Sequence, residues 1–199
     1  MNSRNKLSAL LALGLIGGAL GLQPVHAADA AKVRSGAQRA MAATGFTLGK
    51  AGPLIVAFED PNCSFCDHLT QEAAPLIAAG KLRMRIVPVA FLKPDSEARA
   101  AAILQSPDPA AAWEQNMRGF DHRKEEGAYP GTQPSFTSDR GLRANLALLQ
   151  DLGNVATPTL LVCEKGASQP ALMQGVPKGR LATLVSGAGS VTPSGDCRP

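Results

Sequence analysis

Two cysteines stand three positions apart at the point where a strand pattern gives way to a helix pattern. Cys63 and Cys66 form a C-x-x-C pair within Glu-Asp-Pro-Asn-Cys-Ser-Phe-Cys-Asp-His, residues 59–68. Unpaired backbone N–H groups and the helix dipole lower the pKa of a thiol at a helix N-terminus from about 8.5 into a range of roughly 3.5 to 7.5. The spacing predicts a redox pair in which Cys63 is the thiolate nucleophile and Cys66, one turn further in, is the more buried resolving thiol.

The same pair is also compatible with half of a zinc site, which needs a second pair of thiol or imidazole ligands. The other two cysteines, Cys163 and Cys197, are far apart in the sequence, and His68 comes one residue too late for the C-x-x-C-H of covalent haem attachment. Redox chemistry is therefore favoured, and we expect no metal site. A histidine at position 68 is typical of a solvated helix surface, and the sequence assigns it no role.

The elements around the cysteines have the order of a thioredoxin-like site, in which a strand precedes the C-x-x-C pair and a helix follows it. Residues 54–58 are a continuous apolar run of strand length, and apolar residues recur at helical spacing from Leu69 to Ile77, where Pro75 should bend or interrupt the helix. Further strands are predicted at 81–87, at 158–163, where a proline opens the strand, and near 171–174. Further helices are predicted at 31–44, at 95–105, from 109 through 117, around 142–149 with an end at Gly153, and at about 177–185. This pattern predicts an α/β thioredoxin-like fold with a helical insertion, residues 95–152, between the two halves of the sheet.

The first 27 residues have the pattern of a secretory signal peptide. Arg4 and Lys6 form a basic start, residues 7–22 an apolar segment, and Val-His-Ala at 25–27 a small-residue cleavage site. We expect cleavage after Ala27 and export to a compartment where disulfides persist; a retained membrane anchor is the less favoured alternative. Without this leader the formal net charge falls from +4 to +2, and no basic cluster indicates nucleic acid as a partner.

The chain after the expected cleavage site has the length of one domain. We divide it into a lead-in helix and linker, residues 28–52, and a thioredoxin-like catalytic domain, residues 53–199. No internal repeat is present.

Cys163 and Cys197 need a separate explanation. In an oxidising compartment, with the first pair assigned to chemistry, the simplest prediction is a structural disulfide that ties a tail rich in Gly, Ser and Pro to the strand after Pro158. The alternative is two free thiols. The residues alone leave open whether the peptide bond before Pro158 is cis or trans.

The chain resembles the catalytic domain of the DsbC/DsbG family of periplasmic disulfide isomerases, and looks most like its DsbG branch. The resemblance covers about residues 54–185 and rests on Phe-Glu-Asp-Pro-Asn-Cys-Ser-Phe-Cys at 58–66, Lys-Pro-Asp at 93–95, Asp-Leu-Gly-Asn-Val-Ala-Thr-Pro at 151–158 and Gly-Val-Pro at 175–177. In that family a threonine–proline pair with a cis peptide bond lies beside the active-site cysteines. The resemblance implies that Thr157 and Pro158 complete the site and expose backbone that can pair with an extended substrate.

Three features depart from the family pattern. Family isomerases carry an N-terminal dimerisation domain, whereas residues 28–53 are all that lies between the expected cleavage site and the central strand, so we expect a monomer that lacks this domain. The dipeptide between the cysteines, Ser-Phe, differs from the family's usual pairs but keeps an aromatic second residue. Ala57 occupies the position where thioredoxin-like enzymes often hold a buried acid, which leaves Glu59, Asp60 or water to transfer protons.

These observations predict a periplasmic thiol:disulfide oxidoreductase that needs no cofactor. The first interpretation is a reductase or isomerase of exported proteins that carry disulfides or oxidised cysteines, kept reduced by a DsbD-like membrane donor as the resemblance implies. The second is a monomeric dithiol oxidase with a DsbA-like role, and the third is a binding module or chaperone whose disulfide is only structural. The target can be a disulfide or a sulfenic acid, because the same thiolate reduces either.

Overall fold

The computed structural model describes residues 27–153 and 155–199. The expected signal peptide, residues 1–27, lies outside the described residues except for Ala27, at which the first helix begins. Among the described helices, none combines the length and the apolar character that crossing a membrane requires.

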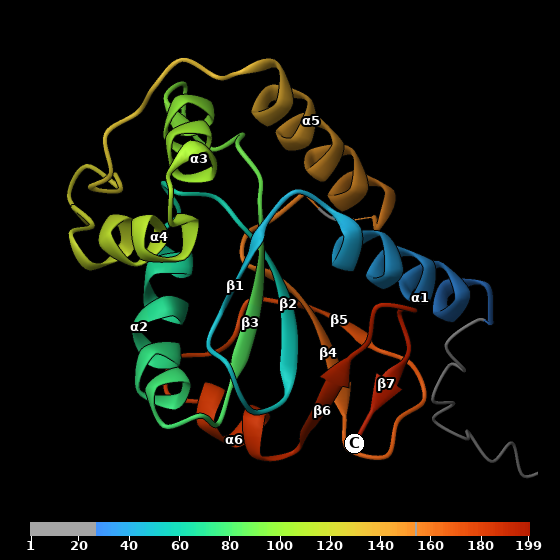
Figure 1. Ribbon diagram of the computed structural model, residues 1–199. Coiled ribbons are helices and arrows are strands. Elements are labelled where there is room, and N and C mark those ends of the chain that lie inside the picture. The colour runs from blue at the N-terminus through green and yellow to red at the C-terminus, as the bar shows by residue number, and fades with distance from the viewer. Residues whose placement is uncertain (1–26, 154) are drawn as a thin grey trace, which may run out of the picture.

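The elements follow one another in an alternating order (Figure 1). The helices are α1 (Ala27–Ala42), α2 (Ser64–Ala78), α3 (Ser96–Gln105), α4 (Pro109–Arg118), α5 (Phe136–Asp151) and α6 (Leu181–Ser186). The strands are β1 (Phe46–Leu48), β2 (Leu54–Glu59), β3 (Arg83–Pro88), β4 (Thr159–Glu164), β5 (Ala171–Gln174), β6 (Ala188–Val191) and β7 (Cys197–Arg198).

The strands form one mixed sheet with β2 near its centre. The order is β1-β3-β2-β4-β6-β7, and β5 pairs with β4 beside this path. Strand β2 is parallel to β3 and antiparallel to β4, and every one of its residues is buried. The strand that leads into the C-x-x-C turn is therefore held by hydrogen bonds on both sides.

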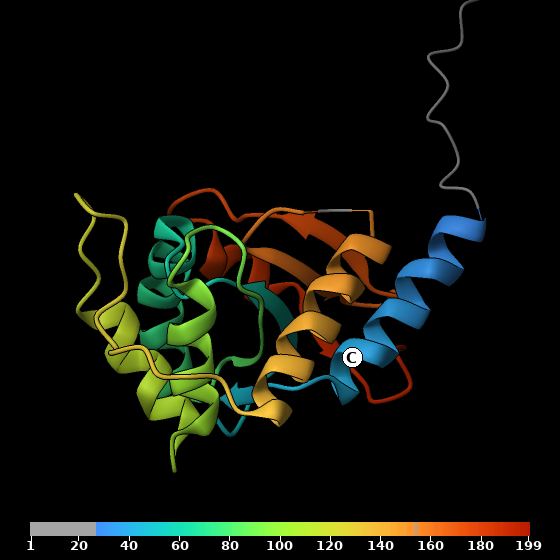
Figure 2. The same ribbon diagram turned by 90° about the horizontal axis from the view of Figure 1, so that it is seen from above.

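Helices cover both faces of the sheet, which explains the continuous apolar run in β2. Ile55 and Ala57 belong to the core formed with α2, α4 and α6, whereas Val56 and Phe58 belong to the core formed with α1 and α5. Viewed from above, α2 and α4 lie on one side and α1 and α5 on the other (Figure 2). Because strand side chains alternate between the faces, neither face of β2 can be polar.

The segment between β3 and β4 holds the three helices α3, α4 and α5, where the sequence predicts an insertion. Figure 1 shows α4 beside α2 and α5 beside α1, with α3 near the top of the sheet. Asp108 begins α4 by accepting a hydrogen bond from the Ala111 N–H at 3.0 Å, and Pro109 follows at the first helical position. Both residues have the roles that their types favour at a helix start.

Three local expectations differ from the structure. Helix α2 is not interrupted at Pro75 but continues to Ala78, because burial of the helix side that carries Leu69 and Ala73 outweighs the one backbone hydrogen bond that proline cannot make. Helix α6 begins at Leu181 rather than near residue 177, which shortens it to a single short helix that buries only Leu181 and Val185. The tail rich in Gly, Ser and Pro forms β6 and β7 instead of an irregular end.

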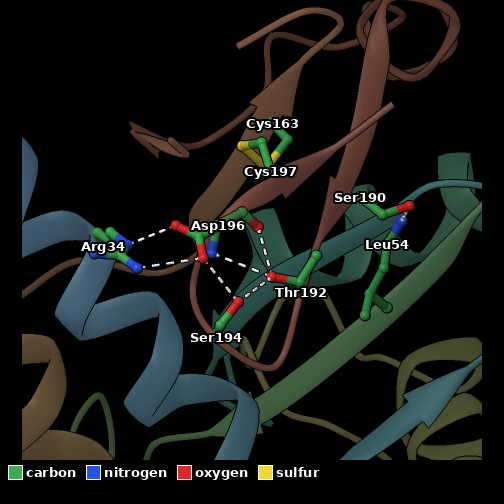
Figure 3. Close-up of a disulfide and its surroundings, with 8 residues drawn as sticks. All are labelled: Arg34, Leu54, Cys163, Ser190, Thr192, Ser194, Asp196 and Cys197. Carbon is green, nitrogen blue, oxygen red and sulfur yellow. Dashed lines mark hydrogen bonds and ion pairs between the residues drawn. A yellow bond between two sulfur atoms is a disulfide. The ribbon is translucent and has the colours of Figure 1, made fainter. Parts of the chain in front are cut away.

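The tail is fixed by a covalent link as well as by strand pairing. Cys163 in β4 and Cys197 in β7 form a disulfide with Cα atoms 5.4 Å apart (Figure 3). Arg34 of α1 makes an ion pair with Asp196 at 2.5 Å, and Thr192 accepts a hydrogen bond from the Asp196 N–H (Figure 3). Together these contacts join the two ends of the described chain to the same edge of the sheet.

Candidate active site

Cys63 is the N-cap residue of α2. Its sulfur accepts a hydrogen bond from the Cys66 N–H at 3.3 Å and lies 3.3 Å from the Thr157 carbonyl oxygen. A hydrogen bond from the Cys66 side chain lowers the pKa of the Cys63 thiol to about 7; burial opposes this shift, and backbone N–H groups of Phe65 and Cys66 reinforce it. The Cys63 thiol therefore ionises more readily than an ordinary thiol and supplies a thiolate near neutral pH.

Cys66 lies one turn further along α2 and is fully buried. Burial raises the pKa of its thiol well above the ordinary value, and its hydrogen bond to Cys63 and the negative charges of Glu59 and Cys63 raise it further. Cys66 therefore keeps its proton at neutral pH. The two thiols of one turn therefore differ widely in acidity.

Thr157 and Pro158 meet the cysteines from the start of β4. The peptide bond between them is cis, and the Thr157 carbonyl is the atom that reaches Cys63. A groove of about 440 Å³ runs past Pro158, with Phe65, His68 and Val176 among its lining residues. The four site residues that the sequence singles out, two from α2 and two from the turn before β4, therefore lie together in the structure.

Exposed apolar side chains surround Cys63. A second hollow, of about 380 Å³, is lined by Cys63 together with Phe65, Leu92 and Val155. Phe65 is 70% exposed, Val155 54% and Leu92 45%, which makes them three of the four large apolar side chains exposed in the described part of the chain. Such a cluster is a favourable surface for apolar segments of another polypeptide.

Asp60 organises the turn that precedes the cysteines. Its Oδ1 accepts hydrogen bonds from the Asn62 N–H at 2.9 Å and from the Ser96 hydroxyl at 2.8 Å, and its Oδ2 accepts from the N–H groups of Phe91 and Leu92 at 2.8 and 3.1 Å. Burial raises the pKa of the Asp60 carboxyl, and these hydrogen bonds limit the increase. Both oxygens are fully engaged, so Asp60 has a positioning role.

Glu59, the last residue of β2, is in the opposite situation. Its side chain is completely buried, and neither carboxyl oxygen has a hydrogen-bond partner among the described residues. Burial raises the pKa of Glu59 well above its ordinary value, and the charge of Cys63 raises it further. The charge of Glu59 in turn raises the pKa of Cys66. Glu59, whose carboxyl oxygens have no partner among the described residues, is therefore a candidate to exchange a proton with Cys66.

Asn116 of α4 is a site-supporting residue that the sequence analysis does not identify. Its Nδ2 donates to the Pro61 carbonyl at 2.9 Å, and its Oδ1 accepts from the Tyr129 N–H at 3.1 Å. It therefore connects the C-x-x-C turn to the loop after α4. Asparagine in the middle of a helix is a weak signal in sequence, because most such residues are solvated.

Cys163 and Cys197 lie apart from this site, toward the other end of β4. One group of three potential metal ligands is present in the described part of the chain, formed by Asp67, His68 and His122, and it includes neither cysteine of the C-x-x-C pair.

Comparisons with known proteins agree with this geometry. The chain is 35% identical over 120 residues to the thiol:disulfide interchange protein DsbG of Escherichia coli, which covers 58% of this chain and 46% of that protein. It is 30% identical over 125 residues to the protein of the same name from Pseudomonas aeruginosa, which covers 59% of this chain and 48% of that protein. The chain therefore spans about half the length of the curated relatives it matches.

Solved structures show the same fold. A periplasmic thioredoxin-like protein from Salmonella enterica serovar Typhimurium aligns with a TM-score of 0.59 at 20% identity and covers 77% of this chain and 94% of that one. The catalytic domain of Proteus mirabilis ScsC aligns with a TM-score of 0.56 at 20% identity and covers 75% of this chain and 96% of that one.

The family model that describes the thioredoxin-like domain matches residues 43–184, a span that includes β2, the C-x-x-C turn, the three inserted helices and the cis proline. The fold, the dithiol at the start of α2 and this match lead to one conclusion: the chain belongs to the thioredoxin-like domain family.

Proposed function

We propose that this chain is a periplasmic thiol:disulfide oxidoreductase that reduces or isomerises disulfides in exported proteins. The observation that carries the proposal is the contrast between two thiols one helical turn apart: Cys63 caps α2 and has its pKa lowered to about 7, whereas Cys66 is fully buried and has its pKa raised well above the ordinary value. Such a pair holds one nucleophile ready and one protonated thiol in reserve. The similarity to DsbG over the catalytic region supports the same chemistry.

In the first step, the Cys63 thiolate attacks one sulfur of the substrate disulfide. A mixed disulfide forms at Cys63, the substrate S–S bond breaks, and the second substrate sulfur leaves as a thiolate that takes a proton from water. Exposed Phe65, Leu92 and Val155 hold apolar parts of an incompletely folded substrate around Cys63. Extended substrate backbone lies in the groove beside Pro158.

In the second step, the Cys66 thiol gives its proton to Glu59 and its sulfur attacks Cys63. The substrate leaves with a second thiolate, which takes a proton from water, and two electrons have passed from the protein dithiol to the substrate disulfide. Once Cys63 is in the mixed disulfide it carries no charge, so one of the two causes that raise the pKa of Glu59 is gone. Glu59 then ionises more readily at the moment when Cys66 needs a proton acceptor.

The pKa of Cys63 favours a reductase or isomerase over a dithiol oxidase. The corresponding thiol has a pKa of about 7 in a reducing thioredoxin and about 3.5 in the strong oxidant DsbA, because stabilising the thiolate stabilises the reduced form. Cys63, at about 7, matches the reducing case. The proposal therefore includes a membrane donor of the DsbD type that returns the oxidised pair to the dithiol.

The chemistry is tested with a purified protein and a substrate that contains a non-native disulfide. Cys63→Ala should abolish exchange, and Cys66→Ala should accumulate a mixed disulfide with the substrate, because the resolving thiol is absent. The double variant Cys163→Ala/Cys197→Ala removes the other two cysteines and should keep exchange activity. Full activity in Cys63→Ala would refute the proposal, and client binding without any exchange in the wild type would favour a chaperone.

The direction of electron flow is tested in cells. Acid quenching followed by alkylation counts the free thiols of Cys63 and Cys66 at steady state. A mostly reduced pair is expected, because a reductase or isomerase must be kept in the dithiol form. A mostly oxidised pair would assign the protein to dithiol oxidation instead.

A further inference from the structure

Two histidines far apart in the sequence lie side by side next to the redox helix. The sequence has three histidines, of which His26 lies outside the described residues. The other two, His68 on α2 and His122 in the loop after α4, stack with ring centroids 5.2 Å apart and an interplanar angle of 22°. Every histidine in the described part of the chain is therefore at this one place.

A buried carboxylate completes the group. The side chain of Asp67 is only 3% exposed, and its Oδ2 lies 3.0 Å from Nε2 of His122. Its Oδ1 accepts a hydrogen bond from Gln71 Nε2 at 3.2 Å, and Gln71 Nε2 lies 3.4 Å from the Met117 carbonyl oxygen. A buried carboxylate needs a cation or hydrogen-bond donors, and Gln71 orients this one toward the histidines.

Hydrogen bonds within the loop after α4 fix the backbone on both sides of His122. Asp121 accepts hydrogen bonds from the N–H groups of Arg123 and Lys124 at 3.0 and 3.3 Å, and its backbone pairs with Glu126. The ring of Phe120 contacts His122 from the side, with centroids 5.1 Å apart. The ring of His122 thus contacts both Phe120 and His68.

We propose that Asp67, His68 and His122 bind a divalent first-row transition-metal ion, of which Zn²⁺ is the simplest probe. One ligand atom from each residue lies within 4.8 Å of the others, and both histidines are exposed enough to rotate. Ligands at about 2.0 to 2.2 Å from zinc stand roughly 3.3 Å apart in a tetrahedron, so rotation of the imidazoles closes the site. Two imidazoles and one carboxylate suit Zn²⁺ and its neighbours in the periodic table rather than Mg²⁺ or Ca²⁺, which prefer oxygen ligands alone.

The site has two structural consequences. It joins the loop after α4 to α2 directly beside Cys66, so bound metal stabilises this loop against the redox helix. His68 also lines the groove beside Thr157 and Pro158, so the ion places a positive charge at the groove wall. With three protein ligands, at least one coordination position stays open to water or to a substrate side chain.

The thiols are the competing ligands, so the test uses full-length protein whose Cys63 and Cys66 have been oxidised to a disulfide. Zn²⁺ is titrated against a chromophoric chelator, and the wild type should take up one equivalent. His68→Ala and His122→Ala should each weaken binding at least about tenfold. Asp151→Asn, which changes a carboxylate beside α1, is the matched control and should bind like the wild type.

Two further measurements separate ligation from folding. Without metal, His68→Ala should unfold at the same temperature as the wild type, because His68 is exposed, whereas His122→Ala should unfold at a lower temperature, because it removes a partner of the buried Asp67 carboxylate. Zn²⁺ should raise the unfolding temperature of the wild type but of neither variant. Co²⁺ bound to the oxidised protein should show ligand-field bands without a thiolate charge-transfer band. The proposal is overturned if the oxidised protein binds no Zn²⁺ or if the histidine variants bind it as tightly as the wild type. Neither result bears on the exchange activity of the dithiol, which is measured separately.

Discussion

Cys63 and Cys66 are the same residue type one helical turn apart, and their positions on α2 give them opposite acid–base properties. Cys63 caps the helix and accepts the Cys66 N–H, so its anion is stabilised, whereas Cys66 is enclosed by the core, where a charge has no partner. The carboxyl groups of Glu59 and Asp60 differ in the same way: that of Glu59 has no hydrogen-bond partner among the described residues, whereas that of Asp60 accepts four hydrogen bonds. At this scale, function follows from which charged forms the surroundings can stabilise.

The thiolate of Cys63 should be detectable by its pH dependence. In reduced protein, the rate of Cys63 alkylation by iodoacetamide should rise with pH and level off, with a midpoint at about 7. A lowered pKa means that the reactive thiolate is present above this midpoint and lost as pH falls through it. Cys66→Ala should move the midpoint upward, because it removes the largest cause of the shift. A wild-type midpoint near the free-thiol value of about 8.5 would contradict the assignment.

Glu59→Gln should stabilise the reduced protein at neutral pH. The pKa of Glu59 is raised in the folded state, so the wild type loses stability as pH rises above the ordinary carboxyl value, by at most about 1.4 kcal/mol per pH unit. Glutamine does not titrate, so this loss is absent in the variant, and the gain should vanish at about pH 3, where the carboxyl is protonated in both states. Urea unfolding at both pH values measures the difference.

The same variant should slow the release of mixed disulfides, because glutamine cannot accept the Cys66 proton. Its rate of initial attack should match the wild type, since that step uses the Cys63 thiolate and Glu59 is not among the groups that set the pKa of Cys63. Unchanged release together with unchanged stability would remove Glu59 from the mechanism.

At the scale of elements, the inserted helices serve the redox turn rather than merely lengthening the chain. Ser96 at the start of α3 binds Asp60, and Asn116 of α4 binds the Pro61 carbonyl. The two thiols lie at the start of α2, and α3 and α4 hold the turn just before it through their hydrogen bonds to Asp60 and Pro61. The insertion is therefore part of the site's support.

Asn116→Ala should destabilise the protein by about 2 kcal/mol or more, because the Pro61 carbonyl and the Tyr129 N–H both lose their partner in a buried place. Gln115→Ala is the matched control: it removes a neighbouring, exposed amide and should change stability by no more than about 0.5 kcal/mol. Chemical denaturation measures both. Equal stabilities for the two variants would show that Asn116 does not support the turn.

At the scale of the whole molecule, β4 connects two separate functions of the cysteines. The turn before its first residue brings Thr157 to the redox pair, and Cys163 near its last residue anchors the C-terminal tail. The tail in turn contacts α1 through the pair Arg34 and Asp196 (Figure 3). The covalent link thus stabilises the sheet edge without touching the site.

The double variant Cys163→Ala/Cys197→Ala should lose about 3 to 4 kcal/mol of stability in the chain-entropy model, since the disulfide closes a loop with a sequence separation of 34. Denaturant unfolding of oxidised wild type and variant gives this value. Exchange activity below the unfolding transition should be retained, and loss of activity in a folded variant would show that the link also shapes the site. Peptide mapping of unreduced wild type that found both thiols alkylatable would reject the disulfide itself.

Local sequence is sufficient for the parts of this protein that depend on neighbours along the chain. The apolar run of β2, the start of α2 at Cys63 and the cap of α4 at Asp108 follow from residue types within a few positions of one another. The α/β class follows from the alternation of these elements. The pairing of Cys163 with Cys197 needs only a count of four cysteines and an assignment for the first two.

Contacts between distant segments decide the other features of the site and of the tail, because the surroundings of a side chain depend on which elements pack against it. Sequence leaves Glu59 and Asp60 as equal candidates for proton transfer. They differ because distant groups, the Phe91 N–H after β3 and the Ser96 hydroxyl at the start of α3, bind the Asp60 carboxylate and none of the described residues binds that of Glu59. The tail has no strand pattern of its own, and its strands form because β6 pairs with the last two residues of β4, next to the covalent link between Cys163 and Cys197. His68 looks like a solvated helix residue until the fold brings His122 and the buried Asp67 against it. In each case the deciding interaction joins residues whose separation along the chain carries no periodic signal.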